Sequence, residues 1–232
     1  MADASSERLD GWIGAWERNS TRWHMPNVNC FLEEFLDVLL AGKKAAKILV
    51  PLCGKTIDMK WLADLGHTVI GVDGAEKAAT EFFTEQNIAY KVEPCDAIQG
   101  TLCCSMDNKI RIYVGDFFKF NQDFEGQFDA IWDRASLVAI DESDRLQYVN
   151  ILNSVLKPGC HCLIEAMDFI PSEKSGSPHA IPLECVRELF GNDYNVKLLK
   201  CINGQEDGFY SLAPFAPLLS RFHINAILVS KL

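Results

Sequence analysis

The chain has 232 residues, of which 48% are hydrophobic and 23% charged, and its formal net charge is −10. This length and composition suit an α/β domain whose core is large enough to fold without disulfides or structural metals. The acidic balance, without any cluster of lysines and arginines, disfavours nucleic acid and anionic membranes as partners, because both require a basic surface.

Targeting and cysteine signals are weak in this sequence. The first ten residues are polar and acidic, and no apolar run approaches the roughly 20 residues that span a bilayer. The nine cysteines follow no familiar spacing and the five histidines are scattered, which favours reduced, mostly buried thiols over a zinc site. We therefore expect a cytoplasmic protein with no metal site. The protein is further expected to be a monomer.

Helical periodicity and strand-like apolar runs alternate along the chain. Helices are predicted at 28–39, 56–65, 75–87, 141–156 and 183–190, and strands at 47–52, 67–73, 110–114, 128–132, 160–166, 196–199 and 223–229. The stretch 90–102 is expected to be looser, and 171–178 to be a loop. The two late strands suit an antiparallel addition to the sheet.

This alternation predicts βαβ units with right-handed crossovers. We expect a doubly wound, mostly parallel, seven-stranded sheet with helices on both faces, a Rossmann-like α/β fold. The expected domain is single and covers 1–232, with an N-terminal lid and helix at 1–45 and a core at 46–232.

Four expected strand ends carry residues suited to ligand binding. In the turn 52–55, Gly54 lets the backbone approach a ligand. Asp73 ends the second strand, where a carboxylate can accept from both hydroxyls of a ribose. Gly115-Asp116-Phe117 offers an acceptor for an adenine amino group and an aromatic cover, and Asp133-Arg134 ends a further strand. Each residue alone also suits a turn or a helix cap, but ligands of such sheets bind at the carboxyl ends of the strands.

The chemistry of this set favours a ligand with ribose and adenine but no diphosphate. The turn lacks the G-x-G-x-x-G pattern that packs a dinucleotide diphosphate against a helix N-terminus. S-adenosyl-L-methionine fits, because its positive sulfonium suits an acidic pocket with aromatic faces. The sequence therefore predicts this cofactor, with S-adenosyl-L-homocysteine as its product.

Several segments resemble the thiopurine S-methyltransferase family, from about Trp12 to the C-terminus. The segments that carry the resemblance are Leu49-Val50-Pro51-Leu52-Cys53-Gly54-Lys55, Met59-Lys60-Trp61-Leu62-Ala63-Asp64, Gly66-His67-Thr68-Val69-Ile70-Gly71-Val72-Asp73, Glu81-Phe82-Phe83-Thr84-Glu85-Gln86-Asn87 and the run from Phe128 to Ile140. The resemblance implies a Rossmann-like methyltransferase fold and methyl transfer from S-adenosyl-L-methionine to a small aromatic or heterocyclic thiol.

The resemblance also implies site residues. Cofactor contacts are expected from the segment 12–23 and the strand ends, namely from Trp12, Trp16, Trp23, Leu52, Asp73, Asp116, Phe117 and Arg134, with Gly54 added from its place in the turn. Acceptor contacts are expected from Trp23, Pro178 and His179. Departures from the family are Asp73, where members often carry Glu, Asp116, where a smaller polar residue occurs, and His179, which replaces a more apolar residue.

Arg134 is the candidate catalytic residue. An aromatic thiol ionises near neutral pH with little help, which is consistent with the absence of a Ser-His-Asp or metal constellation. Arg134 can stabilise the thiolate or orient the acceptor through a water, and it can also form an ion pair with Asp133 or Asp141. The tryptophans of segment 12–23 suit a lid over the ligands, a helix packed on the sheet, or both at once.

Three alternatives stay open at this point. A methyltransferase of the same fold can act on another thiol, a selenol, an inorganic sulfur species or an amine. A nicotinamide-dependent dehydrogenase shares the pattern of residues 66–73 but needs the phosphate loop that is missing here. A sensor of an adenosine-containing ligand would bind without turnover.

Overall fold

The computed structural model describes residues 4–205 and 213–231, the side chains of residues 4–8 excepted. Within these ranges the chain forms two compact units. The first contains residues 4–29 and 44–120, and the second contains residues 30–43, 121–205 and 213–231. The expected division into a lid at 1–45 and a core at 46–232 stays a prediction, and its residues 1–3 lie outside the described residues.

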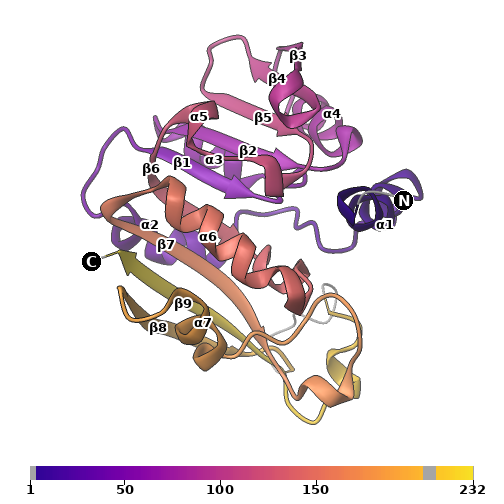
Figure 1. Cartoon of the computed structure of the whole chain (residues 1–232), viewed down its shortest axis with the longest axis vertical. Coiled ribbons are helices and arrows are strands. Elements are labelled where there is room, and N and C mark those ends of the chain that lie inside the picture. The colour runs from indigo at the N-terminus through magenta and orange to yellow at the C-terminus, as the bar shows by residue number, and fades with distance from the viewer. Residues whose placement is uncertain (1–3, 206–212, 232) are drawn as a thin grey trace. The chain divides into compact units, whose positions relative to one another are not determined.

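The first unit is built on strands whose order is β3-β4-β5-β2-β1. Strands β1, β2 and β5 are parallel, whereas β3 and β4 add to β5 in antiparallel fashion. Its elements are α1 (Ala4–Glu17), β1 (Lys47–Pro51), α3 (Asp58–Asp64), β2 (Thr68–Asp73), α4 (Glu76–Glu85), β3 (Tyr90–Cys95), β4 (Gly100–Ser105) and β5 (Ile110–Val114). Helix α1 lies beyond the carboxyl ends of β1 and β2 (Figure 1).

Continuous apolar runs explain the central strands of this unit. Ile48, Leu49 and Val50 of β1 are fully buried, as are Val69 and Ile70 of β2, and helices α3 and α4 pack against β2 and β5. Strands buried on both faces read as unbroken hydrophobic runs rather than as alternating ones. Full burial of each such side chain stabilises the fold by about 1.5–3 kcal/mol.

The stretch from residue 90 to 105 departs from the expectation of loose structure. It forms the hairpin of β3 and β4, in which the Tyr90 ring stacks on Phe83 of α4 with ring centroids 4.4 Å apart. Strand β3 is an edge strand and most of its residues are exposed. An edge strand needs no apolar pattern, so the sequence carried little signal for it.

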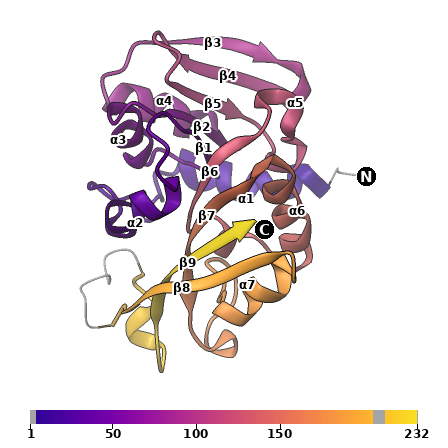
Figure 2. The same cartoon turned by 90° about the vertical axis from the view of Figure 1, so that its left-hand side faces the viewer.

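The second unit has the strand order β6-β7-β9-β8. Strands β6 and β7 are parallel, and β9 runs antiparallel between β7 and β8, which confirms the expected late antiparallel strand. Its elements are α2 (Cys30–Leu40), α5 (Gln122–Glu125), β6 (Phe128–Arg134), α6 (Arg145–Val155), β7 (Leu156–Asp168), α7 (Leu183–Phe190), β8 (Tyr194–Asn203) and β9 (His223–Lys231). Helix α2 packs on β6 and β7, and α6 lies on the opposite face of these strands (Figure 2).

The described ranges contain nine strands, two more than the seven expected, because the hairpin adds β3 and β4. Within the same ranges no helix combines the length and apolar character needed to cross a bilayer. All nine cysteines of the chain are free thiols, and only Cys30 and Cys201 are exposed.

Gly71 of β2 is a position where a side chain cannot be accommodated. A Cβ there would lie 2.6 Å from the Cys53 sulfur and 3.0 Å from the Met59 sulfur, whereas a Cβ on Gly11 of α1 would meet nothing within 4 Å. We expect Gly71→Ala to lower the free energy of unfolding by about 1–3 kcal/mol through overpacking. Gly11→Ala, the matched control in an exposed helix, should leave it unchanged or raise it by up to about 1 kcal/mol. Urea titrations of both variants without ligand test this, and equal stabilities would contradict the packing argument.

Candidate active site

The carboxylate of Asp73 lies at the centre of the first unit's strand ends. Its Oδ2 accepts the Gly54 backbone N–H at 2.7 Å and its Oδ1 accepts the Ala75 N–H at 2.9 Å. The residue is 8% exposed, and burial raises its pKa to about 6 although the two N–H groups lower it. Each carboxylate oxygen can accept more than one hydrogen bond, so Asp73 retains acceptor capacity for two ribose hydroxyls.

The turn after β1 has an unusual backbone. Leu52 has a φ of 42° and Gly54 a φ of 52°. A non-glycine residue in the left-handed region costs about 1–3 kcal/mol and persists where its surroundings impose it. A Cβ at Gly54 would lie only 2.4 Å from the His24 ring. The turn therefore needs glycine both for its conformation and for the close approach of the N-terminal segment.

The N-terminal segment 12–24 forms an aromatic cluster in the first unit. Trp23 contacts Trp12 and Trp16 edge-on, with ring centroids 5.4 and 6.3 Å away, and His24 lies 4.8 Å from Trp16. Trp16 is buried against Ala75 and Ala78 at the start of α4, whereas Trp12 is 37% exposed. Trp16 is thus packed, but on α4 rather than on the sheet as the packed-helix interpretation expected, and Trp12 and Trp23 keep exposed surface.

Asp116 and Phe117 follow β5 in the same unit. The Asp116 Oδ1 accepts the Phe118 N–H at 3.0 Å and so caps the short 3-10 helix Phe117–Lys119. The Phe117 ring is buried and lies parallel to Phe120, with centroids 6.3 Å apart. Asp116 therefore caps a short helix rather than merely starting a loop, and the adenine contacts of both residues stay predictions.

Lys55 follows the glycine of the turn, where a phosphate-binding loop would place its lysine. Its Nζ instead donates to Glu81 Oε2 at 2.7 Å and to Glu85 Oε1 at 2.6 Å, both on α4. Desolvation lowers the pKa of Lys55, but the two carboxylates outweigh it and raise the pKa above its usual value. The Lys55 ammonium is thus paired with two carboxylates in this structure. The turn also lacks the G-x-G-x-x-G pattern of a dinucleotide-binding loop.

A second buried carboxylate, Asp133, is the last residue but one of strand β6 in the second unit. It accepts the Tyr148 hydroxyl at 2.8 Å on one oxygen and the N–H groups of Ser136 and Leu137 at 2.8 and 3.1 Å on the other. Burial raises its pKa to about 6. These bonds fix the turn at Ala135, whose φ is 54°. Asp133 therefore sets the backbone conformation directly after Arg134.

Arg134, Pro178 and His179 belong to the second unit. Arg134 is the half-buried last residue of β6. The His179 N–H donates to the Val138 carbonyl at 2.7 Å, and the His179 Nε2 lies 3.0 Å from Asp141 Oδ1. Pro178 follows a cis peptide bond and its carbonyl accepts from Lys174. The structure thus joins the 178–179 loop to the turn that follows Arg134.

Sequence reasoning missed two groups of this arrangement. One is His24, which lies against Gly54, and the other is Tyr148, which falls within the predicted helix 141–156. A phenol on the apolar face of a helix must find a hydrogen-bond partner when buried, so Tyr148 carried a usable signal. Among the described residues, no group of three or more His, Cys, Asp or Glu is arranged to hold a metal.

Comparison with solved structures identifies the class of fold. A 1,6-didemethyltoxoflavin-N1-methyltransferase of Burkholderia thailandensis, solved with S-adenosylhomocysteine, matches with a TM-score of 0.62 at 13% identity, over 100% of this chain and 92% of its own. The chain therefore has the Rossmann-like fold of S-adenosyl-L-methionine-dependent methyltransferases, as its sequence predicts.

Sequence comparison then identifies the family. The profile of the thiopurine S-methyltransferase family matches residues 7–209. A probable thiopurine S-methyltransferase of Danio rerio is 38% identical over 86% of both chains, and the Bos taurus thiopurine S-methyltransferase is 36% identical over 86% of this chain and 82% of its own. The chain belongs to the thiopurine S-methyltransferase family. Membership confirms the predicted enzyme class and cofactor, and it removes the dehydrogenase alternative.

The raised pKa of Asp73 predicts a pH-dependent affinity for the cofactor product. Above about pH 6 the group is a carboxylate that can accept from ribose hydroxyls, and below it the acid is neutral and one oxygen becomes a donor. We expect the Kd of S-adenosyl-L-homocysteine to be constant above pH 7 and to rise toward tenfold per pH unit below about 6. Calorimetry between pH 5 and 8 measures this.

Asp73→Asn is the control, because Asp133 also has a pKa of about 6. The amide cannot ionise, so this variant should bind more weakly but with a Kd independent of pH over that range. A pH dependence that survives in Asp73→Asn would assign the effect to another group.

Proposed function

We propose that the protein transfers the methyl group of S-adenosyl-L-methionine to the sulfur of a small aromatic or heterocyclic thiol. The observation that carries the proposal is the buried Asp73 carboxylate at the end of β2, held by Gly54 and Ala75, in a chain of the thiopurine S-methyltransferase family. A buried acid whose pKa is raised is costly for the fold, and such groups concentrate at functional sites.

The residues of the first unit bind the cofactor in this proposal. Asp73 accepts from the ribose hydroxyls, and the backbone at Leu52 and Gly54 borders the ligand. Asp116 and Phe117 contact the adenine. The aromatic faces of Trp12 and Trp23 suit the positive sulfonium, which supplies the electrophilic methyl group when the cofactor is bound.

Arg134 acts on the acceptor thiol. A displacement at the methyl carbon requires the sulfur nucleophile to approach opposite the leaving sulfur, and alignment of the two reactants can supply roughly 7–11 kcal/mol in favourable cases. The guanidinium stabilises the negative charge of the thiolate before transfer and orients it. Asp133 supports this role because it fixes the turn after Arg134. Pro178 and His179, with Trp23, contact the acceptor.

Segment 12–24 serves as a lid with a fixed anchor. Trp16 is buried against α4, so the anchor stays packed, while Trp12 and Trp23 shield the ligands from water. We further propose that the protein is a single-domain cytoplasmic monomer with a small-molecule thiol as its partner. The nine free thiols support a reducing compartment, and the net charge of −10 argues against nucleic acid.

Binding and turnover test the proposal together. S-adenosyl-L-homocysteine at 100 times its Kd should add about 2.7 kcal/mol to the free energy of unfolding, and NADH should add nothing. An aromatic thiol should be methylated with a kcat/KM at least tenfold above that of an alkyl thiol, because an alkyl thiol with a pKa of about 8.5 is only a few per cent ionised at pH 7.

The acceptor panel also contains a selenol, an inorganic sulfide and an aromatic amine, so that it separates the alternatives. A preference for one of these would replace the thiol assignment. Binding of S-adenosyl-L-homocysteine without turnover of any acceptor would indicate a sensor instead.

Arg134→Lys separates a catalytic from a structural role of this residue. Lysine keeps the charge but loses the planar guanidinium. We expect kcat on an aromatic thiol to fall by about tenfold to a hundredfold, a loss of roughly 1.4–2.8 kcal/mol, with the Kd of S-adenosyl-L-homocysteine changed less than threefold. Arg187→Lys on α7, an exposed arginine paired with Glu184, is the matched control. Wild-type kinetics in Arg134→Lys would show that the guanidinium is not needed for transfer.

A further inference from the structure

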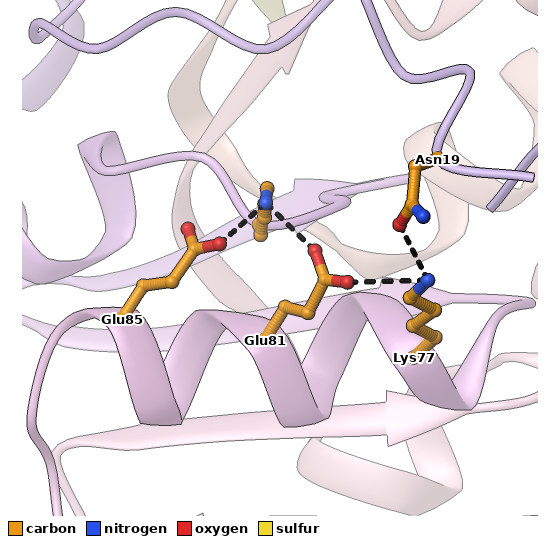
Figure 3. Close-up of polar contacts among 5 residues, drawn as sticks. Asn19, Lys77, Glu81 and Glu85 are labelled. Atoms are coloured by element: carbon orange, nitrogen blue, oxygen red, sulfur yellow. Dashed lines mark hydrogen bonds and ion pairs between the residues drawn. The ribbon is translucent and has the colours of Figure 1, made fainter. Parts of the chain in front are cut away.

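A chain of polar contacts links the N-terminal segment to the turn after β1. Lys77, Glu81 and Glu85 project from one side of α4, and Asn19 reaches Lys77 from the N-terminal segment (Figure 3). The Lys77 Nζ donates to Asn19 Oδ1 at 2.6 Å and lies 3.5 Å from Glu81 Oε1, while Glu81 Oε2 accepts from Lys55 at 2.7 Å. We call this Asn19–Lys77–Glu81–Lys55 set the polar strap.

Both ends of the strap reach elements of the candidate site. Lys55 directly follows Gly54, whose N–H donates to Asp73. Asn19 lies in the turn after α1, where its N–H donates to the Trp16 carbonyl at 3.0 Å, and Trp16 is the buried anchor of the aromatic cluster. The strap therefore connects the N-terminal segment to the turn after β1. The same two elements meet where the His24 ring lies against Gly54.

The strap is more than an isolated surface ion pair. The side chains of Lys55, Glu81 and Lys77 are 18%, 25% and 36% exposed, and Glu81 is shared by two lysines. Lys55 and Glu81 are partly buried, whereas the contact of Lys77 with Asn19 is exposed. Exposed isolated pairs contribute little, but networks that include partly buried charges are screened less by water and salt. Lys77 and Asn19 are 58 positions apart in sequence. Their contact therefore stabilises the packing of the N-terminal segment on α4, and not the helix α4 itself.

We propose that Lys77, with Asn19 as its acceptor, is a positioning residue for the cofactor site, because it fixes segment 12–24 on α4 and so holds the aromatic cluster over the Gly54 turn. Lys77 touches no ligand in this role. The inference rests on the proposed function, since the aromatic cluster is the cofactor's cover there.

The backbone at Asn19 permits a sharp test. Asn19 has a φ of 55°, a conformation that glycine adopts without strain, so Asn19→Gly removes the acceptor and preserves the turn. Lys77→Met removes the donor and keeps most of the side-chain stem. Asn19→Asp keeps an acceptor for the ammonium and is the conservative rescue.

We expect Asn19→Gly and Lys77→Met each to raise the KM for S-adenosyl-L-methionine and the Kd for S-adenosyl-L-homocysteine roughly threefold to tenfold, with kcat changed less than twofold. The double variant should show no greater loss than Lys77→Met alone, because Lys77→Met already breaks the contact with Asn19 together with the ion pair to Glu81. Asn19→Asp should bind as the wild type does. Hydrogen exchange of residues 10–25 without ligand should be faster in Asn19→Gly.

Lys91→Met is the matched control, because Lys91 forms an ion pair with Glu93 at 2.7 Å on the edge strand of the same unit. It should change neither KM nor exchange in residues 10–25. Wild-type KM and Kd in Asn19→Gly and Lys77→Met overturn the positioning role. Failure of the unmodified protein to bind S-adenosyl-L-homocysteine is a different outcome, which overturns the proposed function and this inference with it.

Discussion

The buried carboxylate of Asp73 is the constraint on which the first unit depends. A carboxylate that is 8% exposed is tolerated only if its oxygens are hydrogen-bonded, and the donors here come from Gly54 and Ala75. These two bonds hold the end of β2, the turn after β1 and the start of α4 in one arrangement. The turn that is held in this way has a left-handed backbone, and His24 approaches Gly54 closely there. The same burial that requires these bonds raises the pKa to about 6, so the group is ionised at neutral pH with little margin.

The second unit contains a similar carboxylate, Asp133, with one more hydrogen-bond partner than Asp73. Each acid lies at or next to the end of a parallel strand, and each accepts from the backbone that follows, Asp73 from one N–H group and Asp133 from two. Asp73 takes its remaining bond from a backbone turn, whereas Asp133 takes it from the Tyr148 hydroxyl on α6. Asp73 therefore keeps more acceptor capacity, while Asp133 is bonded to a helix hydroxyl as well and fixes the backbone after Arg134. The same residue type thus has different surroundings at the two strand ends.

The central strands and most helices could be predicted from the sequence, because a run such as Ile48-Leu49-Val50 has only one stable place in a sheet covered by helices. The hairpin of β3 and β4 could not, since an exposed edge strand has no apolar pattern to detect. For the site, the strand-end position of Asp73 was readable from spacing alone. Its two N–H donors were not, and neither was the contact of Asn19 with Lys77, because each depends on how distant segments pack. The predicted contacts of the site residues with ligands remain predictions.

Differences in burial along the N-terminal segment bear on the two interpretations that the sequence allows, a packed helix and a lid. Trp16 is 3% exposed and packs on Ala75 and Ala78, so a ligand can reach its ring only if the anchor itself unpacks, which would cost most of the roughly 1.5–3 kcal/mol that burial of a large side chain contributes. Trp12 is 37% exposed and Trp23 is half-buried, and both already present ring surface. A cover that must open and close repeatedly is drawn from weakly held parts of a structure. The exposed ring surface of this cluster is therefore that of Trp12 and Trp23, and Trp16 is the buried residue on which the cluster packs.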